Sequence, residues 1–223
     1  LVLCGRRQDR LDELQKTLSA HTEVHTLQFD VRDKKAVSEQ IESLPKAFSS
    51  IDILINNAGN AHGLDPIQNG NLDDWDAMID GNIKGLLYVS KAIIPQMIAR
   101  KSGHIINIGS TAAKEVYPNG NVYCATKHAV DALNQGMRMD LNPFGIRVGA
   151  IHPGMVSTEF SNVRFKGDNE KAQNVYKGFD PLQAEDIADI IHFVVSRPYH
   201  VNIADLVVMP TAQASSGIVN RSL

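Results

Sequence analysis

Short apolar runs alternate with longer stretches of helical periodicity along the whole chain, and this alternation constrains the fold more than any other feature. Short apolar runs bounded by turn residues are typical of strands buried on both faces. A strand, a helix and a second strand in succession form a βαβ unit, and a series of such units gives a parallel sheet covered by helices. The sequence therefore predicts an α/β protein with a doubly wound parallel sheet.

We expect strands over residues 1–4, 24–29, 51–55, 104–108, 146–151 and 206–209. Helices are expected over residues 8–19, 33–44, 73–100, 122–141 and 184–196, and several of them open with Asp or Asn, which suit a helix start. This order is that of a Rossmann fold. No Pro/Gly/Ser-rich linker interrupts it, so residues 1–223 are predicted to form a single domain. The stretch 153–181 is the least regular and is a candidate lid over a site.

Composition excludes several classes of protein. The 22 basic and 25 acidic residues are spread along the chain, with no basic block to follow a nucleic acid or an anionic membrane. Cys4 and Cys124 are too few for a disulfide scaffold and too far apart for a metal knuckle. No apolar run approaches the ~20 residues that span a bilayer, and no signal peptide opens the chain. We expect a cytoplasmic protein with no nucleic-acid or membrane partner.

A group of side chains suited to proton transfer follows the predicted strand 104–108. Ser110 comes just after the strand, and Tyr123 and Lys127 lie four residues apart at the start of the next predicted helix, on one helix face. A free phenol has a pKa near ~10, so Tyr123 needs a stabilised phenolate to act near neutrality, and the Lys127 ammonium is placed to supply it. Ser110 is placed to hydrogen-bond a substrate oxygen.

Further motifs gather at the same edge of the predicted sheet. Tyr-x-x-x-Lys alone also fits a packing tyrosine and a solvated lysine, but here it accompanies Ser110, Asn56-Asn57-Ala58-Gly59, Asn82 and Pro153-Gly154. With this combination the chain resembles the short-chain dehydrogenase/reductase family over essentially its whole length. The resemblance implies an enzyme that passes hydride directly between a nicotinamide and a substrate carbon, a reaction that needs no metal.

The resemblance also implies roles for particular residues. It implies that Tyr123 exchanges the proton and that Ser110 positions the substrate. Lys127 is implied to bind the nicotinamide ribose and to lower the pKa of Tyr123. Asn82 completes the catalytic tetrad, and a local helix break there is expected to hold a water that links Lys127 to solvent. The residues that it places around the cofactor are Asn57, Ala58, Gly59, Tyr123, Lys127, Pro153, Gly154 and Thr158.

The first loop indicates which nicotinamide cofactor is used. NAD sites usually place an acidic residue after the second strand of the fold, whereas the 2′-phosphate of NADP needs cations. In this chain Arg6 and Arg7 follow the strand 1–4, which corresponds to the second strand of the family fold. Two arginines at a helix start oppose the helix dipole, so a bound anion explains them better than helix stability does. A solvated basic turn is the alternative. Asp30 and Val31 match the family position near the adenine. The sequence therefore predicts NADP.

One element of the family pattern is not found in the sequence. The glycine-rich phosphate loop is expected one strand and one helix before Leu1, a segment on the order of 25 residues. We expect the first strand and this loop to be absent from the chain, which leaves sheet edges unpaired.

The substrate class is predicted from the stretches 107–112, 158–168 and 198–203, which resemble the NADP-dependent 3-hydroxy acid dehydrogenase branch, also described as serine or allo-threonine dehydrogenases. The resemblance implies a small hydroxy acid substrate and a homotetramer. Arg164 in the lid suits a substrate carboxylate, which a guanidinium binds bidentately. An ion pair between Arg164 and Glu159 is an equally good interpretation.

Two other functions stay open: a carbonyl reductase of bulkier 3-oxoacyl or sterol-like substrates, and a non-catalytic NADP(H)-binding sensor. An apolar, open lid would favour the reductase, whereas intact Ser110, Tyr123 and Lys127 argue against the sensor. Cys124 is expected to fill space beside Tyr123. The histidines show no metal-ligand spacing and are interpreted as polar or packing residues; they include His104, His128, His152 and His200.

Overall fold

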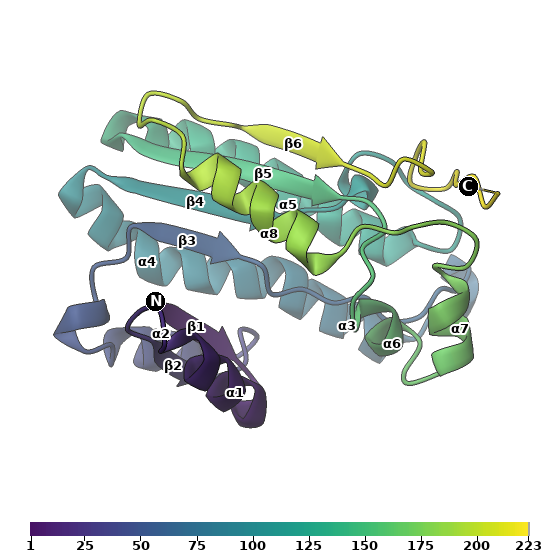
Figure 1. Ribbon diagram of the computed structural model, residues 1–223, viewed down its shortest axis with the longest axis horizontal. Helices are drawn as coiled ribbons and strands as arrows, with labels where there is room; N and C mark the ends of the chain where they lie inside the picture. The colour runs from purple at the N-terminus through teal and green to yellow at the C-terminus, as the bar shows by residue number, and fades with distance from the viewer. Residues whose placement is uncertain (223) are drawn as a thin grey trace.

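A computed structural model describes residues 1–222 and shows a layer of parallel strands with helices on both faces (Figure 1). The strands are β1 (Val2–Gly5), β2 (His25–Gln28), β3 (Ile53–Asn56), β4 (Gly103–Ile108), β5 (Ile146–Pro153) and β6 (Asp205–Val208). Each lies within two residues of its predicted position. Every ladder is parallel, in the orders β1-β2 and β3-β4-β5-β6. The prediction of a doubly wound α/β fold is confirmed.

The strand layer is divided between β1 and β3. Within residues 1–222, β1 pairs only with β2, and β3 pairs only with β4. Ile53 and Ile55 of β3 are 43% and 42% exposed, an unusual state for isoleucine in an α/β sheet. The unpaired edges agree with the expectation that sheet edges lack a partner, and the absent first strand to which this was attributed stays a prediction. The single domain over 1–223 also stays a prediction, and its last residue, Leu223, lies outside the described part of the chain.

Helices cover the four-stranded sheet on both faces. On one face α4 (Leu86–Arg100) and α5 (Asn121–Leu141) bury Ile93, Met97 and Leu141 against Ile105 and Val148. On the other face α8 (Ala184–Val195), in front of the sheet in Figure 1, packs around Val194. The remaining helices are α1 (Gln8–Leu18), α2 (Lys34–Glu42), α3 (Leu72–Ile79), α6 (Phe160–Arg164) and α7 (Asn169–Asn174). In residues 1–222, no helix combines the length and apolar character needed to cross a membrane.

Two regions differ from the prediction. The single helix expected over 73–100 is divided into α3 and α4 by a wider, π-helical turn, Asp80–Gly85. The break surrounds Asn82, as expected, and inserted turns of this kind are frequent at functional sites. The stretch 153–181 holds α6 and α7, of five and six residues. These helices are too short to show the apolar periodicity by which helices are recognised in a sequence.

His104 lies unpaired in the core. This β4 residue is 1% exposed, and neither ring nitrogen has a hydrogen-bond partner in the described residues. Burial, reinforced by neighbouring Arg147, lowers the pKa of His104 from 6.5 to about 4. The fold therefore holds His104 neutral, and its contribution to stability is fully present above pH 6.5 and is lost as the pH falls towards 4.

We predict that His104→Leu removes this part of the pH dependence. Between pH 6.5 and 4 the free energy of unfolding of the wild-type protein should fall by about 3 kcal/mol more than that of the variant. One unit of pKa shift corresponds to about 1.4 kcal/mol. Urea unfolding at several pH values measures the difference. His21→Leu, at an exposed histidine, should keep the wild-type profile, and equal slopes for all three proteins would contradict the prediction.

Candidate active site

The predicted catalytic residues lie on the loop after β4, on the first turns of α5 and on the π-helical turn Asp80–Gly85. Ser110 follows β4 in extended conformation, and its Oγ accepts a hydrogen bond from the amide of Ala112 at 3.1 Å. This bond fixes the side chain at the start of a short 3-10 turn, Thr111–Ala113. Because the hydroxyl uses a lone pair in this contact, its proton is left for another acceptor.

Tyr123 stands at the first turn of α5 beside Ser110. It is 8% exposed, and its ring meets the edge of Phe160 with centroids 5.7 Å apart. Burial raises the pKa of the Tyr123 hydroxyl above its usual value, and nearby Tyr117 adds to the rise, whereas Ser110 and Arg164 lower it. The hydroxyl is therefore protonated at neutral pH and is suited to donate a proton.

Lys127 lies one helical turn after Tyr123 and is 7% exposed. Its Nζ donates to the carbonyl oxygen of Ile108 at 3.0 Å, and burial lowers its pKa to about 8. In this structure the groups that lower the pKa of Tyr123 are thus Ser110 and Arg164, while Lys127 faces the end of β4. The expected effect of Lys127 on Tyr123 stays a prediction.

Asn82 is held in the π-helical turn by its side chain. Its Oδ1 accepts from the amide of Asn60 at 2.8 Å, and its Nδ2 donates to the Asn60 carbonyl at 2.8 Å and to Thr126 Oγ1 at 3.0 Å. Gly59 lies between it and Lys127, since a Cβ there would be 3.2 Å from Asn82 Oδ1 and 3.5 Å from Lys127 Nζ. The structure therefore brings Asn82 and Lys127 to the same place, and the expected water stays a prediction.

We predict that Asn82→Ala destabilises the fold by about 2 kcal/mol, because it leaves two partly buried backbone groups of Asn60 without their partners. Thr126→Val, which keeps both contacts between Asn82 and Asn60 and removes the hydroxyl that bonds Asn82 and the Tyr123 carbonyl, should cost about 1 kcal/mol. Urea unfolding measures both values. An Asn82→Ala variant no less stable than Thr126→Val would show that the paired contact with Asn60 is not what holds the turn.

A groove opens at the carboxyl ends of β1, β2 and β3, with a cavity volume of about 110 Å³. Arg6 and Arg32 line it on either side of Asp30, at 3.8 and 2.6 Å from the carboxylate. The side-chain hydrogen bond from Arg32 lowers the pKa of Asp30. Of the predicted cofactor residues, the groove is lined by Arg6, Asp30, Val31, Ala58 and Gly59. Arg32 was missed by the sequence analysis, although its place two residues after Asp30 is a usable signal.

Arg7 turns elsewhere. Its guanidinium lies 2.9 Å from Glu159, which also pairs with Arg10 at 2.9 Å. This pairing joins the start of α1 to the segment that precedes α6. Arg6 and Arg7 are adjacent in the sequence, but only Arg6 lines the groove. The expectation that Glu159 pairs with Arg164 is wrong, because Glu159 is held by α1.

The residues after β5 are fixed by the C-terminal segment. Gly154 donates its amide to the carbonyl of Val208 at 2.7 Å, and a Cβ on it would lie 2.1 Å from Oε1 of Gln213. That same oxygen accepts from the amide of Met155 at 2.9 Å. Pro153 is the last residue of β5, and Thr158 accepts from the amide of Phe160 at 3.2 Å.

Arg164 projects from α6 towards Tyr123. It donates to the Gly63 carbonyl at 3.1 Å and to the Tyr117 hydroxyl at 3.0 Å, and its guanidinium carbon lies 5.4 Å from the centre of the Tyr123 ring. Arg164 and Tyr123 both line one small pocket, with His62 and Trp75. Tyr117, which contacts Arg164 and stands beside Tyr123, was not identified from the sequence.

A family comparison decides the relationship: residues 1–169 match the family model described as short chain dehydrogenase. The chain belongs to the short-chain dehydrogenase family. Its relatives include the NADP-dependent 3-hydroxy acid dehydrogenase YdfG of Escherichia coli, 46% identical over 98% of this chain and 88% of that protein. Sulfoacetaldehyde reductase 2 of Chromohalobacter salexigens is 46% identical over 97% and 86%.

Solved structures agree with this assignment. The closed form of a serine dehydrogenase complexed with NADP⁺ superposes with a TM-score of 0.94 at 45% identity, covering 98% of this chain and 88% of that one. A serine dehydrogenase from Escherichia coli matches with a TM-score of 0.82 at 40% identity, over 96% and 87%. The resemblance to the short-chain dehydrogenase/reductase family is thus confirmed.

Proposed function

We propose that this chain is an oxidoreductase that transfers a hydride between NADP(H) and the 3-hydroxyl or 3-oxo carbon of a small 3-hydroxy acid, of the L-serine, L-allo-threonine or 3-hydroxypropionate type. The observation that carries the proposal is the convergence of Ser110 and Arg164 on Tyr123, which lines one small pocket together with Arg164. Two hydroxyls and a guanidinium within reach of one another suit a substrate with a reacting oxygen and a carboxylate.

The groove fits an NADP cofactor. Arg6 and Arg32 offer cations at the carboxyl ends of β1 and β2, where doubly wound folds bind dinucleotides. Residues that would hold the cofactor are Arg6, Arg7, Asp30, Val31, Asn57, Ala58, Gly59, Tyr123, Lys127, Pro153, Gly154 and Thr158. When bound, its nicotinamide supplies or accepts the hydride. Arg7 serves this purpose only if it leaves Glu159, so Arg6 is the principal phosphate ligand in this proposal.

The chain's own groups handle the proton. Ser110 donates its hydroxyl proton in a hydrogen bond to the substrate oxygen, and Tyr123 gives its proton to that oxygen in the reductive direction. Because burial keeps Tyr123 protonated, reduction can begin at neutral pH. Oxidation needs a deprotonated Tyr123 and is favoured as the pH rises. Asn82 holds the π-helical turn beside Lys127, and in this proposal Lys127 leaves the Ile108 carbonyl to support the charge that develops on Tyr123.

Arg164 supports a small acid rather than a bulky substrate. Its guanidinium lies beside Tyr123 and lines the same pocket, and a partly buried cation there disfavours an acyl chain or a sterol. A guanidinium also suits a sulfonate, the anionic group of the substrate for which the related sulfoacetaldehyde reductase 2 is named.

We infer a cytoplasmic homotetramer, by resemblance to the 3-hydroxy acid dehydrogenase branch. Exposed apolar side chains support association: Leu72 on α3 is 68% exposed and Met139 on α5 is 71% exposed. Contiguous apolar patches are typical of surfaces that pair with another chain, so these two helices are the faces on which such a patch is proposed.

We predict that the full-length protein reduces NADP⁺ with L-serine or 3-hydroxypropionate and that Tyr123→Phe lowers kcat by about 10²–10⁴-fold. Absorbance of NADPH measures the rate, with NAD⁺ in parallel and with sulfoacetaldehyde assayed in the reductive direction. Activity with a 3-hydroxyacyl thioester alone would favour the reductase of bulky substrates. Tight NADPH binding with no turnover of any substrate would favour the sensor.

We predict that Arg6→Ala raises the KM for NADP⁺ about tenfold or more, because it removes a charge-assisted contact to the 2′-phosphate. The KM for NAD⁺ should change little, since NAD⁺ lacks that phosphate. Arg7→Ala should have a smaller effect, because Arg7 is paired with Glu159. Arg10→Ala, which removes the other partner of Glu159, is the matched control. A larger effect of Arg7→Ala than of Arg6→Ala would contradict this ranking.

A further inference from the structure

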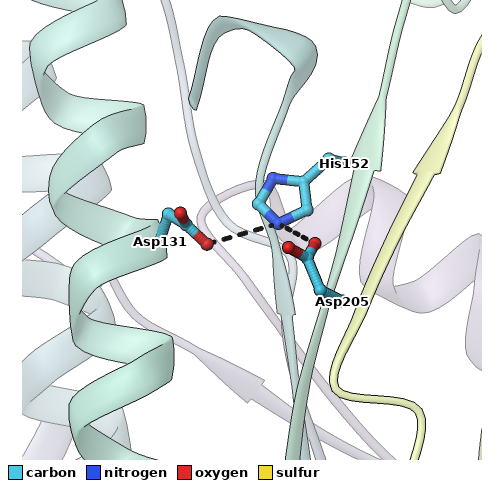
Figure 2. Close-up of side chains that lie close together, drawn as sticks. All are labelled: Asp131, His152 and Asp205. Atoms are coloured by element: carbon cyan, nitrogen blue, oxygen red, sulfur yellow. Dashed lines mark ion pairs between the residues drawn. The ribbon is translucent and has the colours of Figure 1, made fainter. Parts of the chain in front are cut away.

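Three potential metal ligands converge beneath the Ser110 loop, outside the proposed catalytic group. They are Asp131 on α5, His152 on β5 and Asp205 at the start of β6, and their ligand atoms all lie within 4.8 Å of one another. Figure 2 shows the imidazole pointing one nitrogen between the two carboxylates. Each ligand comes from a different part of the chain, which is why the sequence showed no metal spacing.

His152 presents an unpartnered nitrogen to this cluster. The side chain is fully buried, and Nε2 makes no bond of hydrogen-bond geometry in the described residues, although it lies 2.9 Å from the Asp205 carboxylate. Nδ1 lies 3.3 Å from the carbonyl oxygen of Ser110, which can only accept. In a neutral ring this contact places the proton on Nδ1 and a lone pair on Nε2. A metal-binding histidine characteristically donates its other N–H to such an oxygen.

The spacing of the ligand atoms suits a small divalent cation. Zinc binds nitrogen and carboxylate oxygen at about 2.0–2.2 Å, so two ligands of a tetrahedral ion lie about 3.3 Å apart. His152 Nε2 is 2.9 Å from Asp205 and 3.6 Å from Asp131, distances on either side of that value. Asp205 is 45% exposed, which leaves a path for the ion and room for water as a fourth ligand.

A cation already touches the two carboxylates. Lys114 Nζ lies 2.6 Å from Asp205 and 3.1 Å from Asp131, but His152 Nε2 still makes no hydrogen bond in the described residues. The ammonium satisfies the oxygens of the cluster and not its nitrogen, whereas a transition-metal ion satisfies both. The Lys114 side chain is 28% exposed and can turn outward to solvent.

We propose that Asp131, His152 and Asp205 form a binding site for one Zn²⁺ ion per chain, which the ion occupies in competition with the Lys114 ammonium. The two cations have different consequences for the Ser110 loop. Lys114 follows the 3-10 turn that Ser110 opens, so the ammonium ties that loop to α5 and β6. Zinc releases this tie and holds the loop through His152 and the Ser110 carbonyl instead.

The test is titration of the chelator-treated, full-length protein with Zn²⁺ by calorimetry, with Co²⁺ absorption as a spectroscopic probe of the ligands. We expect the wild-type protein to bind one ion per chain. His152→Leu and Asp205→Asn should each raise the Kd at least about tenfold, because each removes a ligand. Lys114→Met should bind the ion more tightly, because the competing charge is gone. Circular dichroism confirms that each variant is folded, and Asp205→Asn, at a partly exposed side chain, serves if His152→Leu does not fold.

His200→Leu is the matched control, because this histidine is exposed and its loss should leave the affinity unchanged. Failure of the wild-type protein to bind one ion per chain at submillimolar Zn²⁺ would overturn the proposal, as would binding that survives His152→Leu and Asp205→Asn. Equal affinities of the wild type and Lys114→Met would overturn the competition. Neither readout requires catalysis, so a failed dehydrogenase assay would not affect the result.

Discussion

Three buried amides hold together the elements from which the site is built. Asn56 donates to Asn107 at 2.9 Å, Asn107 donates to Asn134 at 3.0 Å, and Asn134 donates to the carbonyl of Ala204 at 3.3 Å. Buried polar groups are costly unless paired, so this chain of bonds tolerates only one register of β3, β4 and α5. The loop 57–59, Ser110 and Tyr123 extend from these same elements, and their relative positions depend on it.

The fold was predictable because its signals are local. Each strand is a short apolar run, and the long helices carry the periodicity of a buried face, so both are legible in the sequence. The π-helical turn was anticipated only as a break, because its form depends on the bonds from Asn82 to Asn60 across 22 residues. The short helices α6 and α7 have no periodicity to detect, and their positions are set by contacts with distant segments.

The candidate site was predictable where its residues follow strand ends, as Ser110, Asp30 and Gly59 do. Parallel strands carry such residues to one edge whatever the details of packing. Partnerships across the chain could not be foreseen: the pairing of Arg7 with Glu159 spans 152 residues, and the Asp131–His152–Asp205 cluster joins three elements. Arg6 and Arg7 are neighbouring residues of the same type, so the sequence gives no reason to assign them different partners. Only the folded structure shows that their surroundings differ.

The close approach of Gly154 and Gln213 makes the C-terminal segment part of the site. The Gln213 amide occupies the space that a side chain at position 154 would need, and it satisfies the amide of Met155 at the end of β5. A larger residue at 154 is tolerable only with a shorter one at 213, and that exchange would leave the Met155 amide unpaired. The two positions can therefore change only jointly, which couples the tail after β6 to the segment that follows β5.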